Sequence, residues 1–273
     1  MSGLGKRLAQ GPPLVLDGGL ATELEARGHD LNHALWSARL LDDDPDAIRA
    51  VHAAYVAAGA EIVITASYQA PAEPAARLAR SVDLARASGA RFVAASIGPY
   101  GAALADGSEY TGDYGDVDLR TWHEPRLRFL ESCDIDLLAC ETIPCLAEAE
   151  ALADLVEKPA WFAFTCRDGT TLRDGTPIAD AVRAVESKAI AVGINCTDPQ
   201  HVAPLLDAID TELPLVAYPN SGETYDPVTK TWSGRSAFLD HVPAWIDRGV
   251  RIVGGCCRVG PIEIAELTTR IRR

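Results

Sequence analysis

Three of the seven cysteines follow short apolar runs in a pattern that suits metal chemistry. Cys196 ends the run Gly-Ile-Asn-Cys at 193–196, and Cys256 and Cys257 end the run Gly-Gly-Cys-Cys at 254–257. Thiolates are good ligands for Zn²⁺, and a zinc site with only three protein ligands keeps its fourth tetrahedral position open, as catalytic sites do. If the fold brings these thiols together, the sequence predicts a catalytic zinc site.

The two adjacent cysteines need a special backbone, because neighbouring residues of a regular strand point to opposite faces. Gly254 and Gly255 permit a break at this place, since glycine reaches positive φ without a Cβ penalty and allows close backbone approach. We expect the chain to turn here and direct Cys256 and Cys257 toward one metal. The alternatives are a vicinal disulfide, a chance pairing, or thiols that are simply small buried apolar side chains.

Other catalytic patterns are missing from the sequence. The six histidines form no His-Glu-x-x-His pair, and no Gly-x-Ser-x-Gly motif is present. The stretch Asp17-Gly18-Gly19 lacks the full dinucleotide fingerprint. The remaining cysteines are expected to be buried or neutral thiols: Cys133, Cys140, Cys145 and Cys166.

Eight short apolar runs alternate with amphipathic segments along the chain. The expected strands are 14–17, 61–65, 91–97, 136–140, 160–165, 190–195, 215–218 and 250–253. Eight strand–helix units with strands apolar on both faces predict a (β/α)₈ barrel, with an open doubly wound sheet as the alternative. Chemistry in such a barrel lies at the carboxyl ends of the strands. Strands six and eight then bring the three thiols together, and Asp17 and Glu141 close strands one and four.

Helices are expected between these strands. The clearest begins at Asp44-Pro45 and ends before Gly59, because Asp is a good N-cap, Pro suits the first helical position and Gly ends helices. The other expected helices are 74–88, 146–157, 199–209, 237–248 and 261–271. We expect 98–124, which is rich in Gly, Asp and Tyr, to form an extended loop at the catalytic end.

The composition excludes several classes of protein. A formal charge of −14 disfavours nucleic-acid binding, because phosphate contacts need clustered Lys and Arg. No apolar run is long enough to cross a bilayer, and the first residues lack the apolar core of a secretory signal. We therefore expect a cytoplasmic protein with no nucleic-acid or membrane partner. Its 273 residues suit one closed barrel, so we expect a single domain over 1–273.

The two cysteine motifs, the second extended by Arg258, resemble those of the homocysteine S-methyltransferases, which include betaine-dependent and S-methylmethionine-dependent enzymes. Further resembling segments are 16–24, 35–38, 65–70, 96–102, 105–110, 140–142 and 218–223. The resemblance covers almost the whole chain and implies a TIM barrel, homocysteine as methyl acceptor, and Zn²⁺ held by Cys196, Cys256 and Cys257. One departure is Val259, where the S-methylmethionine-dependent members tend to carry Thr.

The resemblance also implies a set of substrate-binding residues. Carboxylates matching Asp17 and Glu141 bind the amino group of homocysteine in this family, as a cationic ammonium requires. Backbone amides around Gly18 and Gly19 are candidates for its carboxylate. Further candidates for the substrate pocket are Thr65, Ser67, Tyr68, Gln69 and Asn220, with Tyr68 and Gln69 beside the donor.

The implied reaction is methyl transfer from a small donor to the homocysteine thiol. We expect S-methylmethionine as donor, with S-adenosylmethionine as a weaker substitute, because 100–110 and 218–223 resemble the S-methylmethionine type more than the betaine type. The alternatives are a betaine-dependent enzyme, a zinc hydrolase or lyase, and a non-catalytic zinc-binding or thiol-sensing barrel. The hydrolase would need a general base, for which the sequence offers no clear candidate. The sequence leaves the oligomeric state open.

Overall fold

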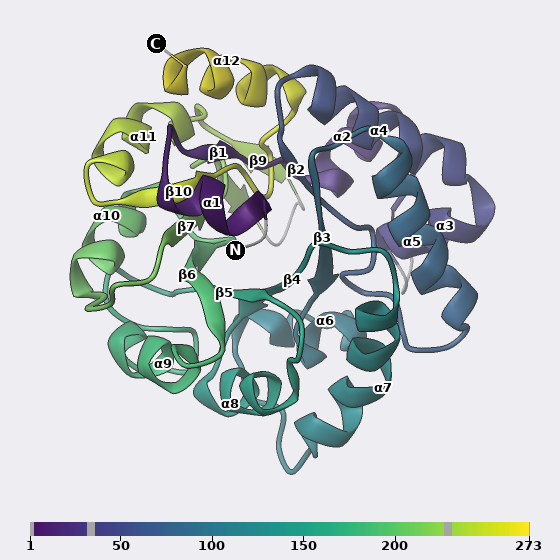
Figure 1. The fold of residues 1–273 in the computed structure, drawn as a ribbon, viewed down its shortest axis with the longest axis horizontal. Coiled ribbons are helices and arrows are strands. Elements are labelled where there is room, and N and C mark those ends of the chain that lie inside the picture. Colours follow the sequence, from purple (N-terminus) through teal and green to yellow (C-terminus); the bar gives the residue numbers. More distant parts are fainter. Residues whose placement is uncertain (1–2, 32–35, 227–230, 273) are drawn as a thin grey trace.

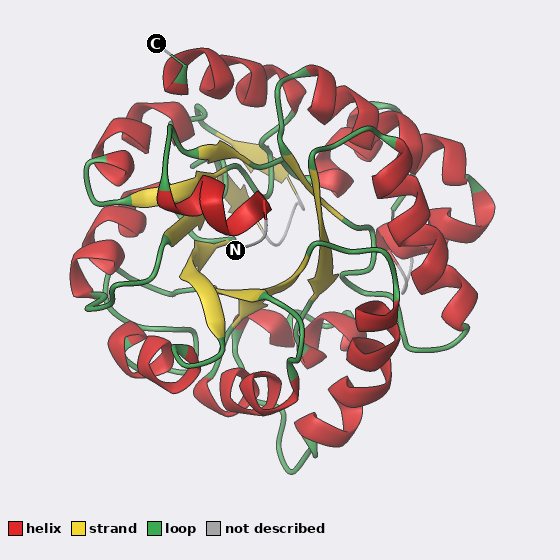
Figure 2. Ribbon diagram, in the orientation of Figure 1, coloured by secondary structure: helices red, strands yellow, loops and turns green. Residues whose placement is uncertain are grey.

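The protein is described by a computed structural model that covers residues 3–31, 36–226 and 231–272. Leu35, in the resembling segment 35–38, lies outside these ranges. Within them, a ring of helices surrounds a central barrel of strands (Figures 1 and 2).

Eight parallel strands form the barrel in the order β1-β10-β7-β6-β5-β4-β3-β2. They are β1 (Leu14–Val15), β2 (Ile62–Ile64), β3 (Phe92–Ile97), β4 (Leu137–Ile143), β5 (Ala160–Phe164), β6 (Ala189–Asn195), β7 (Leu215–Tyr218) and β10 (Val250–Val253). An isolated parallel bridge between Leu16 and Ile62 closes the ring. The predicted (β/α)₈ barrel and its eight strands are therefore confirmed, and the open sheet is wrong.

The helices that cover the barrel include all six that the sequence predicts. Helices of the described residues are α1 (Gly3–Ala9), α2 (Leu20–Ala26), α3 (Leu40–Asp43), α4 (Pro45–Ala57), α5 (Ala75–Ala87), α6 (Tyr100–Leu104), α7 (Leu119–Ser132), α8 (Leu146–Leu155), α9 (Ile178–Val185), α10 (Pro199–Ala208), α11 (Phe238–Ile246) and α12 (Pro261–Ile271). Short 3₁₀ helices are η1 (Trp36–Arg39) and η2 (Ser108–Tyr110), and a hairpin pairs β8 (Thr224–Asp226) with β9 (Thr231–Ser233). In the part of the chain that is described, no helix is both long and apolar enough to cross a membrane.

The prediction of one extended loop over 98–124 is wrong. This stretch contains α6, η2 and the first turns of α7. Asp118 caps α7, since its carboxylate accepts a hydrogen bond from the Thr121 amide at 3.0 Å. Pro125 lies inside α7, and an internal proline ordinarily breaks a helix, which obscures the helical pattern in the sequence.

Two apolar layers hold the fold together, one inside the barrel and one between the barrel and the helices. Along β5, Trp161 and Ala163 face the interior while Phe162 and Phe164 face the helices, as the two-residue period of a strand requires. Leu4 and Leu8 of α1 join the interior layer. Helix α1 lies across the barrel opening that faces the viewer in Figure 1. It therefore does not cover the opposite opening, at the carboxyl ends of the strands, where the active sites of such barrels lie.

Candidate metal centre and substrate pocket

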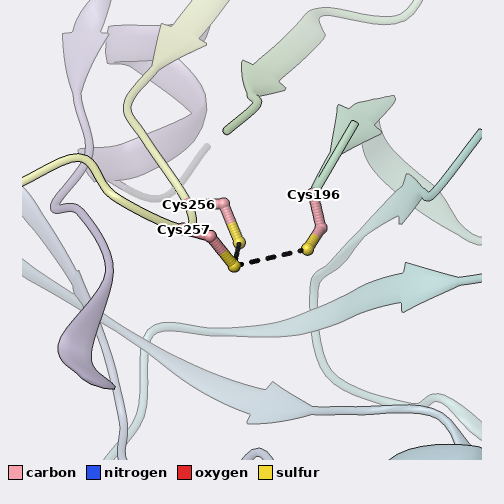
Figure 3. Close-up of side chains that lie close together, drawn as sticks. All are labelled: Cys196, Cys256 and Cys257. Atoms are coloured by element: carbon pink, nitrogen blue, oxygen red, sulfur yellow. Dashed lines mark hydrogen bonds between the residues drawn. The ribbon is translucent and has the colours of Figure 1, made fainter. Parts of the chain in front are cut away.

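The three predicted thiols meet at the carboxyl end of the barrel (Figure 3). The Sγ atoms of Cys196 and Cys257 are 3.8 Å apart, and those of Cys256 and Cys257 are 4.0 Å apart. A Zn–S bond of about 2.3 Å in a tetrahedral site places its sulfur atoms about 3.8 Å from each other. The cluster can therefore hold a metal ion with little rearrangement, and the adjacent thiols do not form the vicinal disulfide considered above.

Cys196 reaches the cluster through an unusual backbone conformation. In β6, Ile194 faces the helices, so a regular strand would also direct Cys196 away from the barrel axis. Instead Cys196 has a φ of 46°, in the left-handed region that non-glycine residues rarely adopt. Thr165 holds this conformation in part, because its Oγ1 donates to the Cys196 carbonyl at 3.0 Å. Such backbone strain is typical of functional sites.

The two glycines before Cys256 are needed for close approach and not for positive φ, which corrects one part of the sequence-based expectation. A Cβ on Gly254 would lie 2.6 Å from the Asp17 carbonyl oxygen, and one on Gly255 would lie 2.2 Å from Cγ1 of Val259. The left-handed residue of this loop is Arg258, with a φ of 67°. The glycines therefore let the loop after β10 press against the loop after β1.

Asn220 braces the same loop from the end of β7. Its Oδ1 accepts a hydrogen bond from the Cys257 amide at 3.2 Å, and the Cys256 amide donates to the Pro219 carbonyl at 2.7 Å. Arg258 forms an ion pair with Glu223 at 3.1 Å, which ties the other end of the loop. The structure thus places Asn220 beside a metal-binding candidate, while its substrate-binding role stays a prediction.

The thiols have unequal acidity. Hydrogen bonds from Cys256 and then Cys257 hold the pKa of the Cys196 thiol well below its usual range. The same contacts raise the pKa of Cys256 and Cys257, because their protons are used to stabilise the Cys196 thiolate. The Tyr110 hydroxyl lies 3.4 Å from the Cys196 Sγ. Cys196 is therefore the most acidic thiol of the cluster.

Asp17 and Glu141 are buried beside this cluster, with exposed fractions of 4% and 7%. Burial raises the pKa of Asp17 well above its usual value, and burial raises the pKa of Glu141 to about 7. The charge of Glu141 also raises the pKa of Asp17, so the two carboxyls are close neighbours. Neither has a cationic partner among the described residues. Two buried acids without a cation form a site for a ligand that carries one.

Polar groups inside the barrel orient the two acids. The Ile64 amide donates to Asp17 Oδ2 at 2.9 Å, and the Ser96 hydroxyl donates to Glu141 Oε1. Tyr218 also hydrogen-bonds Glu141, and Trp161 Nε1 donates to the Tyr218 hydroxyl oxygen at 3.1 Å. Sequence reasoning missed Ser96 and Tyr218 as partners of Glu141, although both lie in resembling segments at strand ends.

Thr65 and Ser67 are buried and already hydrogen-bonded. Ser67 Oγ donates to the Ser96 carbonyl at 2.8 Å, and Thr65 Oγ1 lies 2.7 Å from Ser67 Oγ and accepts from the Ser96 amide at 3.0 Å. These hydroxyls therefore fix the end of β3, from which Ser96 reaches Glu141. Their direct contact with a substrate stays a prediction.

Gly18 and Gly19 lie where the loops after β1 and β10 meet. A Cβ on Gly18 would lie 2.3 Å from the Val259 carbonyl oxygen, and one on Gly19 would lie 2.6 Å from the Cys256 carbonyl oxygen. The Gly19 amide donates to Val259 at 3.0 Å, whereas the Gly18 amide has no partner in the described part of the chain. Of these two backbone amides, the one of Gly18 is therefore available to donate a hydrogen bond to a ligand.

Tyr68 and Gln69 follow β2, and Gln69 is held against α6. Gln69 Nε2 donates to the Ala102 carbonyl at 2.8 Å, and its Oε1 is buried with no partner within the described ranges. Burial raises the pKa of Tyr68 well above its usual value, and the charges of Cys196 and then Glu109 add to this rise. Tyr68 therefore lies near Cys196, and the donor-binding role of both residues stays a prediction.

The remaining cysteines behave as predicted. Cys140, Cys145 and Cys166 are buried, and Cys133 is partly exposed. Burial raises the pKa of Cys145 and of Cys166 to about 12, and it also raises the pKa of Cys133 and Cys140. These neutral thiols lie outside the three-cysteine metal-binding candidate.

A (β/α)₈ barrel with two buried acids and a three-thiol cluster that could hold a metal ion at the carboxyl ends of its strands has the architecture of a barrel enzyme. The homocysteine S-methyltransferase family model matches residues 14–271. The chain belongs to the homocysteine S-methyltransferase family. The predicted family and enzyme class are thereby confirmed.

Individual relatives agree with this assignment. The chain is 42% identical to homocysteine S-methyltransferase YbgG of Bacillus subtilis (strain 168), covering 96% of this chain and 95% of YbgG. It is 46% identical to the homocysteine S-methyltransferase of Escherichia coli (strain K12), covering 94% of each protein. The structure matches the metallated form of the homocysteine methyltransferase MmuM from Escherichia coli with a TM-score of 0.86, covering 96% of this chain and 98% of that chain.

Proposed function

We propose that this protein transfers a methyl group from S-methylmethionine to the thiol of L-homocysteine, with Zn²⁺ held by Cys196, Cys256 and Cys257. The observation that carries the proposal is a thiol cluster and a pair of buried acids side by side at the carboxyl end of the barrel. The Gly255 amide donates to the Asp17 carbonyl at 3.1 Å, so the acids and the thiols are joined through the loop itself. One small molecule with a thiol and an ammonium group can therefore reach both.

In this proposal Asp17 and Glu141 bind the ammonium group of homocysteine. Their burial without a cation makes an ammonium the complementary ligand, and its contacts would be charge-assisted hydrogen bonds. The substrate carboxylate is attached to the same carbon as the ammonium. The unpartnered Gly18 amide, next to Asp17, is positioned to receive it.

Thiol activation needs both ionisation and positioning. Bound zinc would hold the substrate sulfur as a thiolate, because the thiolate is both the metal ligand and the nucleophile. Complete ionisation of a thiol with a pKa of about 8.5 gains at most about 30-fold at neutral pH. The chain's residues must supply most of the remaining acceleration by fixing homocysteine through its ammonium and carboxylate groups while its sulfur faces the donor.

The proposed bond changes balance without a general acid. The homocysteine sulfur forms a bond to the methyl carbon, while the bond from that carbon to the sulfonium sulfur breaks. The bonding electron pair stays on the departing sulfur, which leaves as a neutral thioether and needs no proton. The thiol proton of homocysteine is released to solvent before this step. With S-methylmethionine as donor, both products are methionine.

The donor assignment rests on the organisation of the chain. One barrel uses nearly all of the described residues, which supports a single homocysteine-binding domain over 1–273, and the segments 100–110 and 218–223 resemble the S-methylmethionine type more than the betaine type. S-Adenosylmethionine would be a weaker substitute in this proposal, and betaine is the alternative donor. We also propose the cytoplasm as the location, because a reducing compartment keeps three clustered thiols free for metal.

The direct test incubates zinc-loaded protein with homocysteine and one donor at a time, and measures the methionine formed. The donors are S-methylmethionine, S-adenosylmethionine, betaine and methyltetrahydrofolate. We expect the fastest turnover with S-methylmethionine and a slower one with S-adenosylmethionine. Methionine from betaine alone would overturn the donor assignment. No methionine from any donor would favour the non-catalytic zinc or thiol-sensing barrel.

A further inference from the structure

Arg173 lies beside the thiol cluster without an acidic partner. Its Nε donates to Thr165 Oγ1 at 3.3 Å, and Thr165 in turn donates to the Cys196 carbonyl. Its guanidinium carbon lies 5.3 Å from the ring centroid of Tyr110. Across the described residues, Arg173 forms no ion pair, although most arginines of this protein form one. Its remaining N–H donors are free for an anion.

Glu109, the neighbour of Tyr110, presents the opposite charge. Its Oε2 is buried and has no hydrogen-bond partner in 3–31, 36–226 or 231–272. Helix α6 fixes its backbone, because a Cβ on Gly101 would lie only 2.3 Å from the Glu109 amide nitrogen. Burial raises the pKa of Glu109, and the nearby charge of Cys196 adds to the rise. This carboxylate therefore lies near the thiols without a cation.

Gln69, from the segment after β2, adds a neutral acceptor that is held against helix α6. Its amide is fixed through the Ala102 carbonyl of α6, so its Oε1 has a defined direction, yet that atom is also buried and unpartnered. Buried polar atoms are normally satisfied, and exceptions in a pocket indicate a missing ligand. Among the described residues, no group donates a hydrogen bond to Glu109 Oε2 or to Gln69 Oε1.

Arg173 and Glu109 adjoin Tyr110, whereas the ammonium of homocysteine is assigned to Asp17 and Glu141, of which Glu141 also lies near Cys196. The Tyr110 hydroxyl lies 3.4 Å from the Cys196 sulfur. The Arg173 guanidinium lies over the Tyr110 ring, and Glu109 precedes Tyr110 in the chain. Asp17 instead contacts the loop that carries Cys256. Glu109, Gln69 and Arg173 are thus distinct from the two acids assigned to the acceptor's ammonium, and they are left available to a second substrate.

We propose that Glu109, Gln69 and Arg173 form the subsite that binds the amino-acid end of the methyl donor. The donor's ammonium bonds to the Glu109 carboxylate and Gln69 Oε1, and its carboxylate binds the Arg173 guanidinium. This assignment rests on the proposed function, because it presumes a second substrate with both groups. It also explains a preference over betaine, whose trimethylammonium group has no N–H to donate to Glu109 or Gln69.

The test measures KM for each substrate in Glu109→Gln and Arg173→Gln, with S-methylmethionine and with dimethylsulfoniopropionate. The second compound has the sulfonium and carboxylate groups but no ammonium. E109Q should raise KM for S-methylmethionine by about 10-fold or more, and R173Q should raise KM for both donors to a similar extent. E109Q should leave KM for dimethylsulfoniopropionate unchanged. KM for homocysteine should stay within about twofold in both variants, because neither residue contacts that substrate.

Matched controls are Asp116→Asn and Arg167→Gln, which remove exposed charges from the same two loops and should change neither KM. Arg173→Lys keeps a cation, so its KM for the donors should lie between those of wild type and R173Q. This variant keeps the test informative if R173Q fails to fold. Unchanged donor KM in E109Q and R173Q, or a change in homocysteine KM instead, would overturn the subsite while leaving the proposed function intact. Absence of methionine formation from S-methylmethionine in wild-type protein would instead reject the proposed donor.

Discussion

Asn195 and Thr142 hydrogen-bond each other twice across the catalytic end of the barrel. Asn195 Nδ2 donates to Thr142 Oγ1 at 2.8 Å, and the Thr142 amide donates to Asn195 Oδ1 at 2.8 Å. Thr142 follows Glu141 and has a φ of 59°, while Asn195 precedes Cys196, whose φ is 46°. A single side chain thus couples the buried acid on β4 to the cysteine that follows β6, and both residues with positive φ depend on it.

Asn195→Ala should therefore weaken two functions at once. Loss of two buried hydrogen bonds should lower the free energy of unfolding by about 1 to 3 kcal/mol, because the Thr142 amide is left unpaired. The variant should also bind zinc more weakly and raise KM for homocysteine. Denaturant unfolding, metal analysis and kinetics check these effects. A change in zinc affinity alone would show that Glu141 does not depend on Asn195.

Each of Cys196→Ser, Cys256→Ser and Cys257→Ser should lose zinc and methyltransferase activity, because two thiolates leave a tetrahedral site incomplete. Cys166→Ser is the matched control, since that thiol is buried, neutral and outside the cluster. Metal content per chain is the measurement. Full zinc stoichiometry and activity in any of the first three variants would remove that cysteine from the site.

Asp17→Asn and Glu141→Gln should raise KM for homocysteine while zinc stays bound. Loss of one charge-assisted contact should cost about 1.5 to 3 kcal/mol, or about 10- to 150-fold in KM. KM for the donor should change little, because neither acid belongs to the proposed donor subsite. Steady-state kinetics with both substrates checks this, and unchanged homocysteine kinetics in both variants would contradict the ammonium site.

The same site should respond to pH with a definite sign. Burial raises the pKa of Glu141 to about 7, so this side chain becomes neutral as the pH falls through 7. A neutral Glu141 attracts an ammonium less, so KM for homocysteine should rise between pH 8 and pH 6. Glu141→Gln removes this titration and should flatten that part of the profile, whereas an equally steep profile in E141Q would assign the dependence to another group.

His52 should make stability depend on pH. This residue of α4 is 1% exposed, both ring nitrogens lack partners in the described chain, and burial lowers its pKa from 6.5 to about 4. Between these values the unfolded chain binds a proton that the folded chain does not. The free energy of unfolding should therefore fall as the pH drops from 6.5 toward 4, by up to about 3 kcal/mol.

The test compares unfolding across this pH range in wild type, His52→Leu and the partly exposed control His201→Gln. His52→Leu should lose this component of the slope, and His201→Gln should retain it. A slope that is the same in His52→Leu and wild type would show that other groups cause the acid sensitivity.

The eight strands could be predicted because short runs that are apolar on both faces stand out between amphipathic segments. Their ends then pointed to Cys196, Asp17 and Glu141 as residues of one pocket. Helix α7 was missed, since Pro125 and several polar residues interrupt its apolar face. The partners of Glu141 were missed for a different reason. Tyr218 and Glu141 lie on β7 and β4, and only closure of the barrel brings them together.

The ring of strands closes at a narrow seam between β1 and β2, where Leu16 and Ile62 form an isolated bridge. Asp17 supplies two hydrogen bonds across this seam, from its amide to the Ile62 carbonyl at 3.1 Å and from the Ile64 amide to its carboxylate at 2.9 Å. A fluctuation that parts β1 from β2 also moves this acid out of the pocket. Deuterium exchange at the Ile64 amide therefore reports how often the acidic half of the pocket is assembled.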